Sequence, residues 1–103
     1  MAADGGHPLV VMANLHRHYR QMLRLDGADV ISAEQAAEVL GIHSYPAKKV
    51  LAQTRRMGAA RIAQAIALLA EADLGLRGTT LLPGETVLEI LVARLARLVR
   101  QGR

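Results

Sequence analysis

The sequence predicts an all-α fold, a compact bundle of five helices in a single domain. Apolar residues recur with helical spacing along most of the 103 residues. Residues that favour strands are scarce, because the chain has no phenylalanine or tryptophan and only two tyrosines. Glycines and helix-capping residues divide the helical pattern into five segments. We expect the domain to span residues 8–103, and residues 1–7 to be a disordered tail or an expression remnant.

The first predicted helix covers Pro8–Leu25 and is ended by Gly27. The second covers Ala33–Leu40. Ser32, followed three residues later by Gln35, forms a capping box, in which the two side chains satisfy free backbone N–H groups at the start of a helix. This local signal sets the start of the second helix.

A turn separates the second helix from a third. Gly41 ends the second helix, since glycine readily adopts the left-handed conformation that follows many helices. The third helix is expected to start near Tyr45, with Ser44 as its N-cap and Pro46 in its first turn, where the missing N–H costs little. Gly58 is expected to break it.

The fourth helix is predicted over Ala59–Leu76, with Gly78 as its stop, and the fifth over Gly84–Arg100. Apolar positions on the fifth helix cover a wider arc than the roughly 100° of a single core-facing stripe. Such a helix packs against a second surface, which is either another part of the core or a partner protein. Nine side chains are expected to be largely buried: Val11, Leu15, Val39, Leu40, Leu51, Ile66, Leu69, Leu91 and Leu95.

A subunit interface is therefore predicted on the fifth helix. The apolar residues Ile90 and Val99 would contribute its exposed apolar surface. Arg94, Arg97 and Arg100, spaced three residues apart, would form a polar rim beside the apolar face.

The composition argues against several classes of protein. The chain has no cysteine, so it has no disulfide or thiolate metal site. His16 and His18 are two residues apart and face different ways on a helix, so they do not form a metal-binding pair. Ser32 and Ser44 are explained as caps, and no glycine-rich phosphate loop is present. We expect no catalytic residue, metal or cofactor, and hence no enzyme activity of the chain itself.

The charge balance favours anionic partners. The net charge is +4 and the isoelectric point about 10.3. The bias toward arginine, alanine and leucine is also typical of a GC-rich genome, so the charge alone does not identify a nucleic-acid-binding protein.

A polar pair is expected near the end of the fourth helix. Asp73 lies at the edge of its apolar stripe, and Arg77 follows four residues later. Because residues four apart are neighbours on a helix, the two side chains are predicted to form a structural ion pair.

The start of the third helix carries Tyr45, Lys48 and Lys49. A ring and two ammonium groups at a helix N-terminus could hold a phosphate backbone and stack on an unpaired base. The alternative is that the tyrosine packs under the turn while the lysines are solvated. The segment Ser32–Leu51 also fits a helix-turn-helix, which would make the third helix a reader of duplex DNA.

Two blocks of sequence resemble a known family. The run Ala36–Lys49 reads AAEVLGIHSYPAKK, and Leu68–Gly78 reads LLAEADLGLRG. Both are similar to motifs of the C-terminal domain of the delta subunit of bacterial DNA polymerase III, and the similarity extends over roughly residues 8 to 100. The chain departs from the family at Ser44, where proline is frequent, and at Arg77, where lysine is usual.

The resemblance implies a helical collar domain, which helps to assemble the clamp loader that places the sliding clamp on primed DNA. It implies other clamp-loader subunits and primed DNA as partners, a cytoplasmic location and no ATP hydrolysis. The family's two N-terminal domains are missing, so the chain is expected to be an excised domain or an isolated homologue. Two other classes remain open: a helix-turn-helix DNA-binding protein, and a small obligate helical dimer with no nucleic-acid role.

Overall fold

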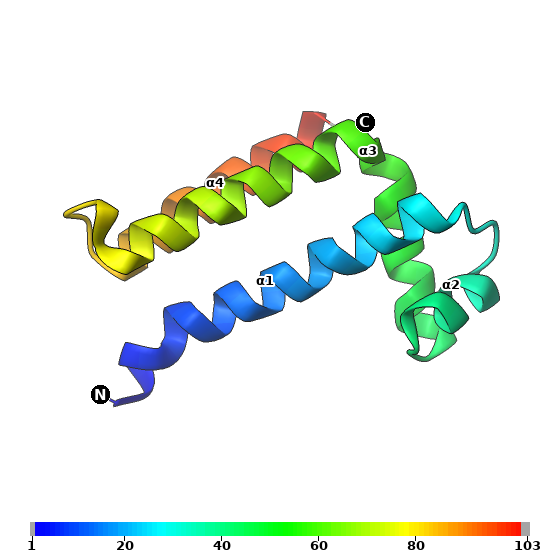
Figure 1. The fold of residues 1–103 in the computed structure, drawn as a ribbon, viewed down its shortest axis with the longest axis horizontal. Helices are drawn as coiled ribbons and strands as arrows, with labels where there is room; N and C mark the ends of the chain where they lie inside the picture. The colour runs from blue at the N-terminus through cyan, green and yellow to red at the C-terminus, as the bar shows by residue number, and fades with distance from the viewer. Residues whose placement is uncertain (1, 102–103) are drawn as a thin grey trace.

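The computed structural model describes residues 2–101, with side chains for residues 8–100. Its elements are the helices α1 (Ala2–Ala28), α2 (Ala33–Leu40), α3 (Ser44–Leu74) and α4 (Gly84–Gln101), with the π-helical turn η1 (Gly75–Thr79) before α4 (Figure 1). No strand occurs within residues 2–101, which confirms the all-α class.

The predicted count of five α-helices is wrong, because two of the predicted helices form the single kinked helix α3. Gly58 has φ 79° and ψ 163°, a backbone conformation open essentially only to glycine. The chain is helical on both sides of this residue, so Gly58 bends α3 without ending it. We call residues 44–57 the first arm of α3 and residues 59–74 the second arm.

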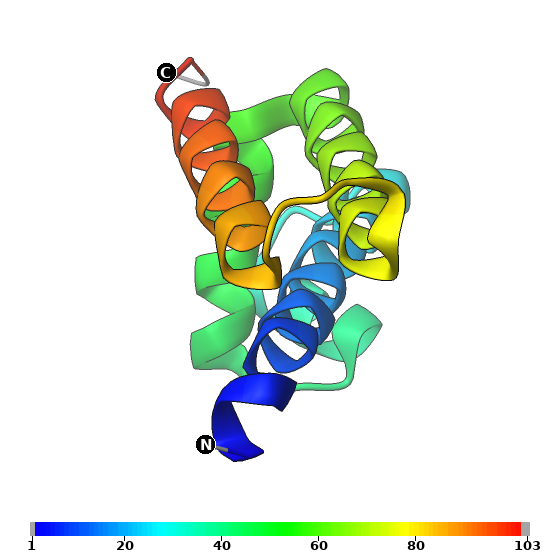
Figure 2. The ribbon, with the colours of Figure 1, turned by 90° about the vertical axis from the view of Figure 1, so that its left-hand side faces the viewer.

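The bend sends the two arms in different directions (Figure 1). The second arm lies beside α4, with η1 and a short loop joining them, and α1 packs beneath this pair (Figure 2). The short helix α2 packs against α3 and α1 at the other end of the molecule. Since α3 contacts every other helix, it organises the whole fold.

The core is formed by one cluster of buried apolar side chains from all four helices. Four of the nine predicted core residues are buried: Leu51, Leu69, Leu91 and Leu95. The other five pack against the cluster but stay partly exposed: Val11, Leu15, Val39, Leu40 and Ile66. The most deeply buried large side chains of α1 and the second arm are Met22, Leu25, Ile62 and the predicted Leu69. The helical period was therefore correct, and the buried face was misplaced mainly on α1, where Met22 and Leu25 are buried more deeply than Val11 and Leu15.

The helix starts and stops are set by local backbone chemistry. The predicted cap of α2 by Ser32 is confirmed, because Ser32 Oγ accepts from Gln35 N–H at 3.1 Å. The return bond of the predicted capping box is shifted by one residue, since Gln35 Oε1 accepts from Ile31 N–H at 3.0 Å rather than from the N–H of Ser32. Gly41 follows α2 with φ 68°, as predicted. The predicted cap of the next helix is one residue off, since His43 is the N-cap of α3 and Ser44 is already helical.

The bounds of α1 also differ from the prediction. Its backbone is helical from Ala2 rather than from Pro8, and it continues through Gly27 to Ala28. Asp29, with φ 57°, then reverses the chain in the left-handed conformation that was expected of a glycine. The expectation of a tail over residues 1–7 falls on positions whose side chains lie outside the described residues, and it stays a prediction.

A polar contact fixes the middle of α1 to the second arm. His16 Nε2 lies 2.7 Å from Asp73 Oδ2, and the ring N–H donates to the carboxylate, which can only accept. Asp73 was predicted to pair with Arg77 on its own helix, but no ion pair joins these two described side chains. The helix changes to π geometry at Gly75, which alters the spacing on which the four-residue pairing depends.

The conformation of Gly58 generates a stability prediction. Nothing lies within 4 Å of a Cβ atom built on Gly58, so Gly58→Ala creates no clash and tests the backbone conformation alone. We expect this substitution to lower the free energy of unfolding by about 1–3 kcal/mol, measured by urea unfolding. The control is Gly27→Ala, also in open space but inside α1, which should be neutral or stabilising. If Gly58→Ala and Gly27→Ala changed the free energy of unfolding equally, the kink at residue 58 would not require glycine.

Candidate functional site

An open groove runs between the second arm of α3 and α4. It consists of two hollows, of about 220 and 360 Å³, which share Leu68 and Arg94 in their walls. None of the described side chains of α1 and α2, residues 8–28 and 33–40, lines either hollow. The lining residues are Gln64, Ala67, Leu68, Glu71 and Ala72 from α3, Gly75 and Thr79 from η1, Thr80 and Leu82 from the loop before α4, and Val87, Ile90, Leu91, Arg94, Arg97 and Leu98 from α4.

The groove follows from the spacing of residues on the two helices. Gln64, Leu68 and Glu71 are three or four residues apart and therefore share one face of α3. Ile90, Arg94 and Arg97 repeat this spacing on α4. Each wall covers about 11 residues, or roughly 16 Å at 1.5 Å per residue. The site is thus long and shallow, bounded by two helix faces.

One ion pair crosses the groove. Arg94 Nη1 donates to Glu71 Oε2 at 3.1 Å, and both side chains are about half exposed or more. Exposed pairs of this kind contribute only about 0.2–1 kcal/mol, so the contact is readily exchanged for another partner. Arg97 makes no ion pair with any described side chain and leaves a positive charge on the groove wall.

The five predicted interface residues are divided by the structure. Ile90, which is 44% exposed, lines the groove together with Arg94 and Arg97. Val99, 37% exposed, instead lines a separate small cavity, and Arg100 lines none of the hollows described. Val99 therefore lies apart from Ile90, Arg94 and Arg97.

Sequence reasoning missed the α3 wall of the groove. Leu68 and Glu71 entered the sequence analysis only within the motif Leu68–Gly78 and were not assigned to an interface. The signal that could have found them is the spacing of Gln64, Ala67, Leu68, Glu71 and Gly75, which places these residues together on a second face of the helix.

The Tyr45 ring is exposed at the start of α3. The side chain is 69% exposed, and Lys49 Nζ lies 4.7 Å from the ring centroid. The ring therefore does not pack under the turn, which was the alternative considered from the sequence. A lysine over an exposed ring makes a cation–π contact of about 0.5–1 kcal/mol. Lys48, also exposed, stands beside this pair in the sequence.

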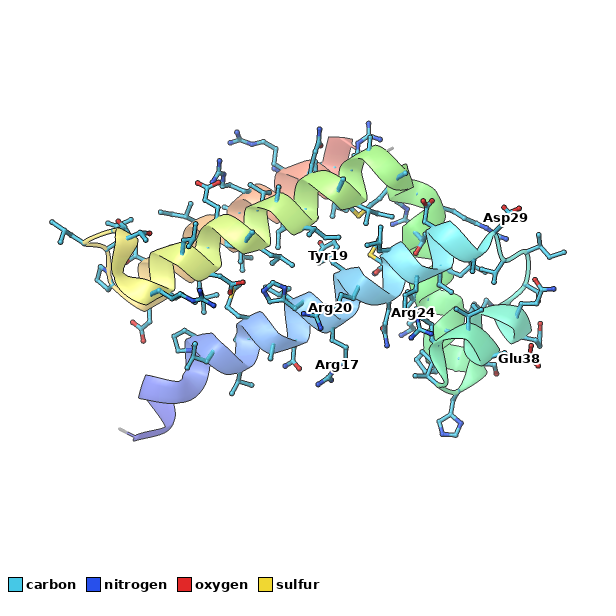
Figure 3. All side chains as sticks on the ribbon, viewed as in Figure 1. Arg17, Tyr19, Arg20, Arg24, Asp29 and Glu38 are labelled. Atoms are coloured by element: carbon cyan, nitrogen blue, oxygen red, sulfur yellow. The ribbon has the colours of Figure 1, made fainter. Side chains whose placement is uncertain are left out.

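A smaller cavity of about 110 Å³ lies between the first arm of α3, α1 and the end of α4. It is lined by His18, Tyr19, Met22, Gln53, Arg56, Met57 and Val99. Tyr19 is only 6% exposed and points from α1 toward α3, whereas Arg17 points away on the opposite side (Figure 3). Burial raises the pKa of the Tyr19 hydroxyl above its ordinary value of 10.0, because a phenolate would lose hydration there.

Among the described residues, no group of three or more histidine, aspartate or glutamate side chains is placed to hold a metal ion. None of the described helices is both long and apolar enough to cross a membrane.

These features define the class of the molecule as a small all-α domain with an open groove between two of its helices. Within this class, the chain belongs to the family of the C-terminal domain of the DNA polymerase III delta subunit, whose family model matches residues 1–95. The resemblance predicted from the sequence is thereby confirmed. This family is a non-catalytic component of the clamp loader. Searches of curated proteins and of solved structures found no significant match.

The buried tyrosine generates a prediction about alkaline pH. Because the pKa of Tyr19 is raised on folding, the unfolded chain loses this proton first as the pH rises. The stability that depends on this proton is therefore fully present below about pH 10 and is lost as the pH rises through the raised pKa. We expect urea unfolding to show a steeper alkaline loss of stability in the wild type than in Tyr19→Phe. Tyr45→Phe, which removes an exposed hydroxyl, should behave as the wild type. Identical alkaline profiles of wild type and Tyr19→Phe would contradict this assignment.

Proposed function

We propose that this chain is a non-catalytic collar domain, which joins other clamp-loader subunits into the assembly that places the sliding clamp on primed DNA. Family membership supports the clamp-loader context. The observation that carries the assembly role is the apolar surface left exposed on α4 and its connection to η1. Leu82, Ile90, Val92 and Val99 are all exposed there. This proposal also places the protein in the cytoplasm, with the other replication proteins.

Exposed aliphatic side chains on α4 can be buried when a partner covers them. Burying one leucine or isoleucine side chain contributes about 1.5–3 kcal/mol. Ile90 and Val99 lie on different sides of α4, so the helix can contact two surfaces outside its own core. A ring of subunits requires each member to have two neighbours, and a helix exposed on both flanks suits that requirement.

A second role, contact with primed DNA in the assembled loader, is favoured by the start of α3. Tyr45 is exposed, and Lys49 lies over its ring. An exposed ring offers a stacking surface for an unpaired base, and two lysines within a turn can neutralise phosphates. The helix-turn-helix alternative would require selective binding to one duplex sequence, whereas this role requires none.

The assembly proposal predicts the effect of a charge on α4. Ile90→Asp should weaken co-purification with the other clamp-loader subunits, because it replaces apolar contact surface with a carboxylate that must lose its hydration when a partner covers it. Thermal unfolding followed by circular dichroism should show that the variant remains folded, since Ile90 is already half exposed. The matched control is Leu23→Asp on α1, an aliphatic side chain of similar exposure, 47% against 44%.

Loss of assembly with Ile90→Asp but not with Leu23→Asp is the expected result. If both variants co-purify with the clamp-loader subunits as the wild type does, the face of α4 that carries Ile90 has no role in assembly. A wild-type chain that forms a stable dimer and captures no clamp-loader subunit would favour the obligate-dimer alternative.

The DNA role predicts a change in salt dependence. The triple variant Tyr45→Ala, Lys48→Ala and Lys49→Ala should flatten the slope of log affinity against log salt by roughly two phosphate charges. Loss of stacking should cost a further ~1–3 kcal/mol of binding. The measurement is binding of the assembled loader to primed DNA over a salt series. The control removes two arginines from α1, by Arg17→Ala with Arg20→Ala (Figure 3). If the triple variant binds primed DNA with the same affinity and the same salt dependence as the wild type, Tyr45, Lys48 and Lys49 do not contact DNA and serve only as the start of α3.

A further inference from the structure

We propose that the groove between the second arm of α3 and α4 binds an amphipathic helix of another subunit, one with an apolar stripe and acidic residues along the flank that meets α4. The inference rests on the proposed assembly function and specifies the chemistry of the partner. It also limits this part of the proposed subunit interface to the side of α4 that lines the groove.

The walls of the groove favour a helix over an extended peptide. Both walls are helix faces, and a helix interior satisfies its own backbone N–H and C=O groups. An extended peptide seated here would find few backbone groups to pair with, and its own polar backbone would be buried without partners. A helical partner brings its backbone bonds already made, so only its side chains need to match.

The size of the residues on α3 allows a helix to approach closely. Ala67, Ala72 and Gly75 keep this wall low, while Leu68 and Ile90 provide apolar contact surface. The groove is about three turns long, which matches partner residues at positions i, i+3, i+4 and i+7. The two hollows provide places for two such partner side chains.

The charges on the walls favour an acidic partner. Among the described side chains, the charged residues that line the groove are Glu71, Arg94 and Arg97, which together carry a net charge of +1. Glu71 is already occupied by Arg94, whereas Arg97 has no partner among the described side chains. A carboxylate on the incoming helix can pair with Arg97, and a second one can share Arg94. A lysine at the same place would face two guanidinium groups.

The structure provides a matched pair of substitutions on one helix. Arg97 lines the groove, whereas Arg100, three residues later, lines none of the described hollows. Both are exposed, and both lie near the end of α4. Arg97→Glu and Arg100→Glu therefore change the net charge equally but alter the groove only in the first case. Ala67→Trp adds a ring to the low wall at an exposed position and blocks the groove without a change of charge.

The test uses two synthetic peptides and the full chain. Each peptide has about 16 residues, four turns of helix, with leucines at the stripe positions. One carries glutamates on the flank and the other carries lysines there. Binding of each fluorescent peptide is measured by anisotropy at low and high salt.

We expect the acidic peptide to bind at least about threefold to tenfold more tightly than the basic one, with the difference reduced by salt. Arg97→Glu should remove this preference, Arg100→Glu should leave it within about twofold, and Ala67→Trp should weaken both peptides. Equal binding of the two peptides, or equal effects of the two arginine variants, would overturn the inference. Self-association of the chain that is lost in Ala67→Trp would also overturn it, since a second copy would then be the occupant.

A parallel experiment separates this inference from the proposed function. The same variants are tested for co-purification with the clamp-loader subunits. Assembly that survives both Arg97→Glu and Ala67→Trp would refute the groove as the partner site and leave the collar function standing. Peptide binding that depends on Arg97, in a chain that captures no clamp-loader subunit, would refute the collar function and support the groove.

Discussion

The backbone conformation of one residue, Gly58, determines how the rest of this molecule is arranged. A side chain at φ 79° and ψ 163° would be strained, so only glycine allows α3 to bend at this point and then resume its helix. The bend lets one helix serve two packing sites. Its first arm supports α2 and the end of α1, and its second arm pairs with α4 over the middle of α1. The groove exists only because the second arm is turned alongside α4.

The fold was predictable wherever the signal was local. Ser32 fixed the start of α2, because its cap bond joins residues only three apart, Ser32 and Gln35. Gly58 was recognised as a break, but a break between helices and a kink within one helix have the same local signal, so the helix count was wrong. The contact of His16 with Asp73 joins residues 57 positions apart, and no spacing in the sequence predicts it.

Only the α4 wall of the candidate site could be predicted from the sequence. The surplus of apolar residues on the last helix pointed to α4, and Ile90 and Arg97 do line an open groove. A helical wheel gives the faces of one helix, whereas a groove requires the relative rotation of two. The α3 wall, with Leu68 and Glu71, and the separation of Val99 from the groove therefore depend on packing that the sequence alone does not specify.

The placement of the two tyrosines has a practical consequence for spectroscopy. The chain has no tryptophan, so its near-ultraviolet absorption and its emission come from Tyr19 and Tyr45. Tyr19 is enclosed in the core, with the His18 ring edge-on at 5.2 Å, whereas Tyr45 is open to solvent. The first reports whether the helices are packed together, and the second reports what approaches the start of α3. Replacing either tyrosine with phenylalanine isolates the other, so the protein carries two separate optical probes, one for its interior and one for its surface.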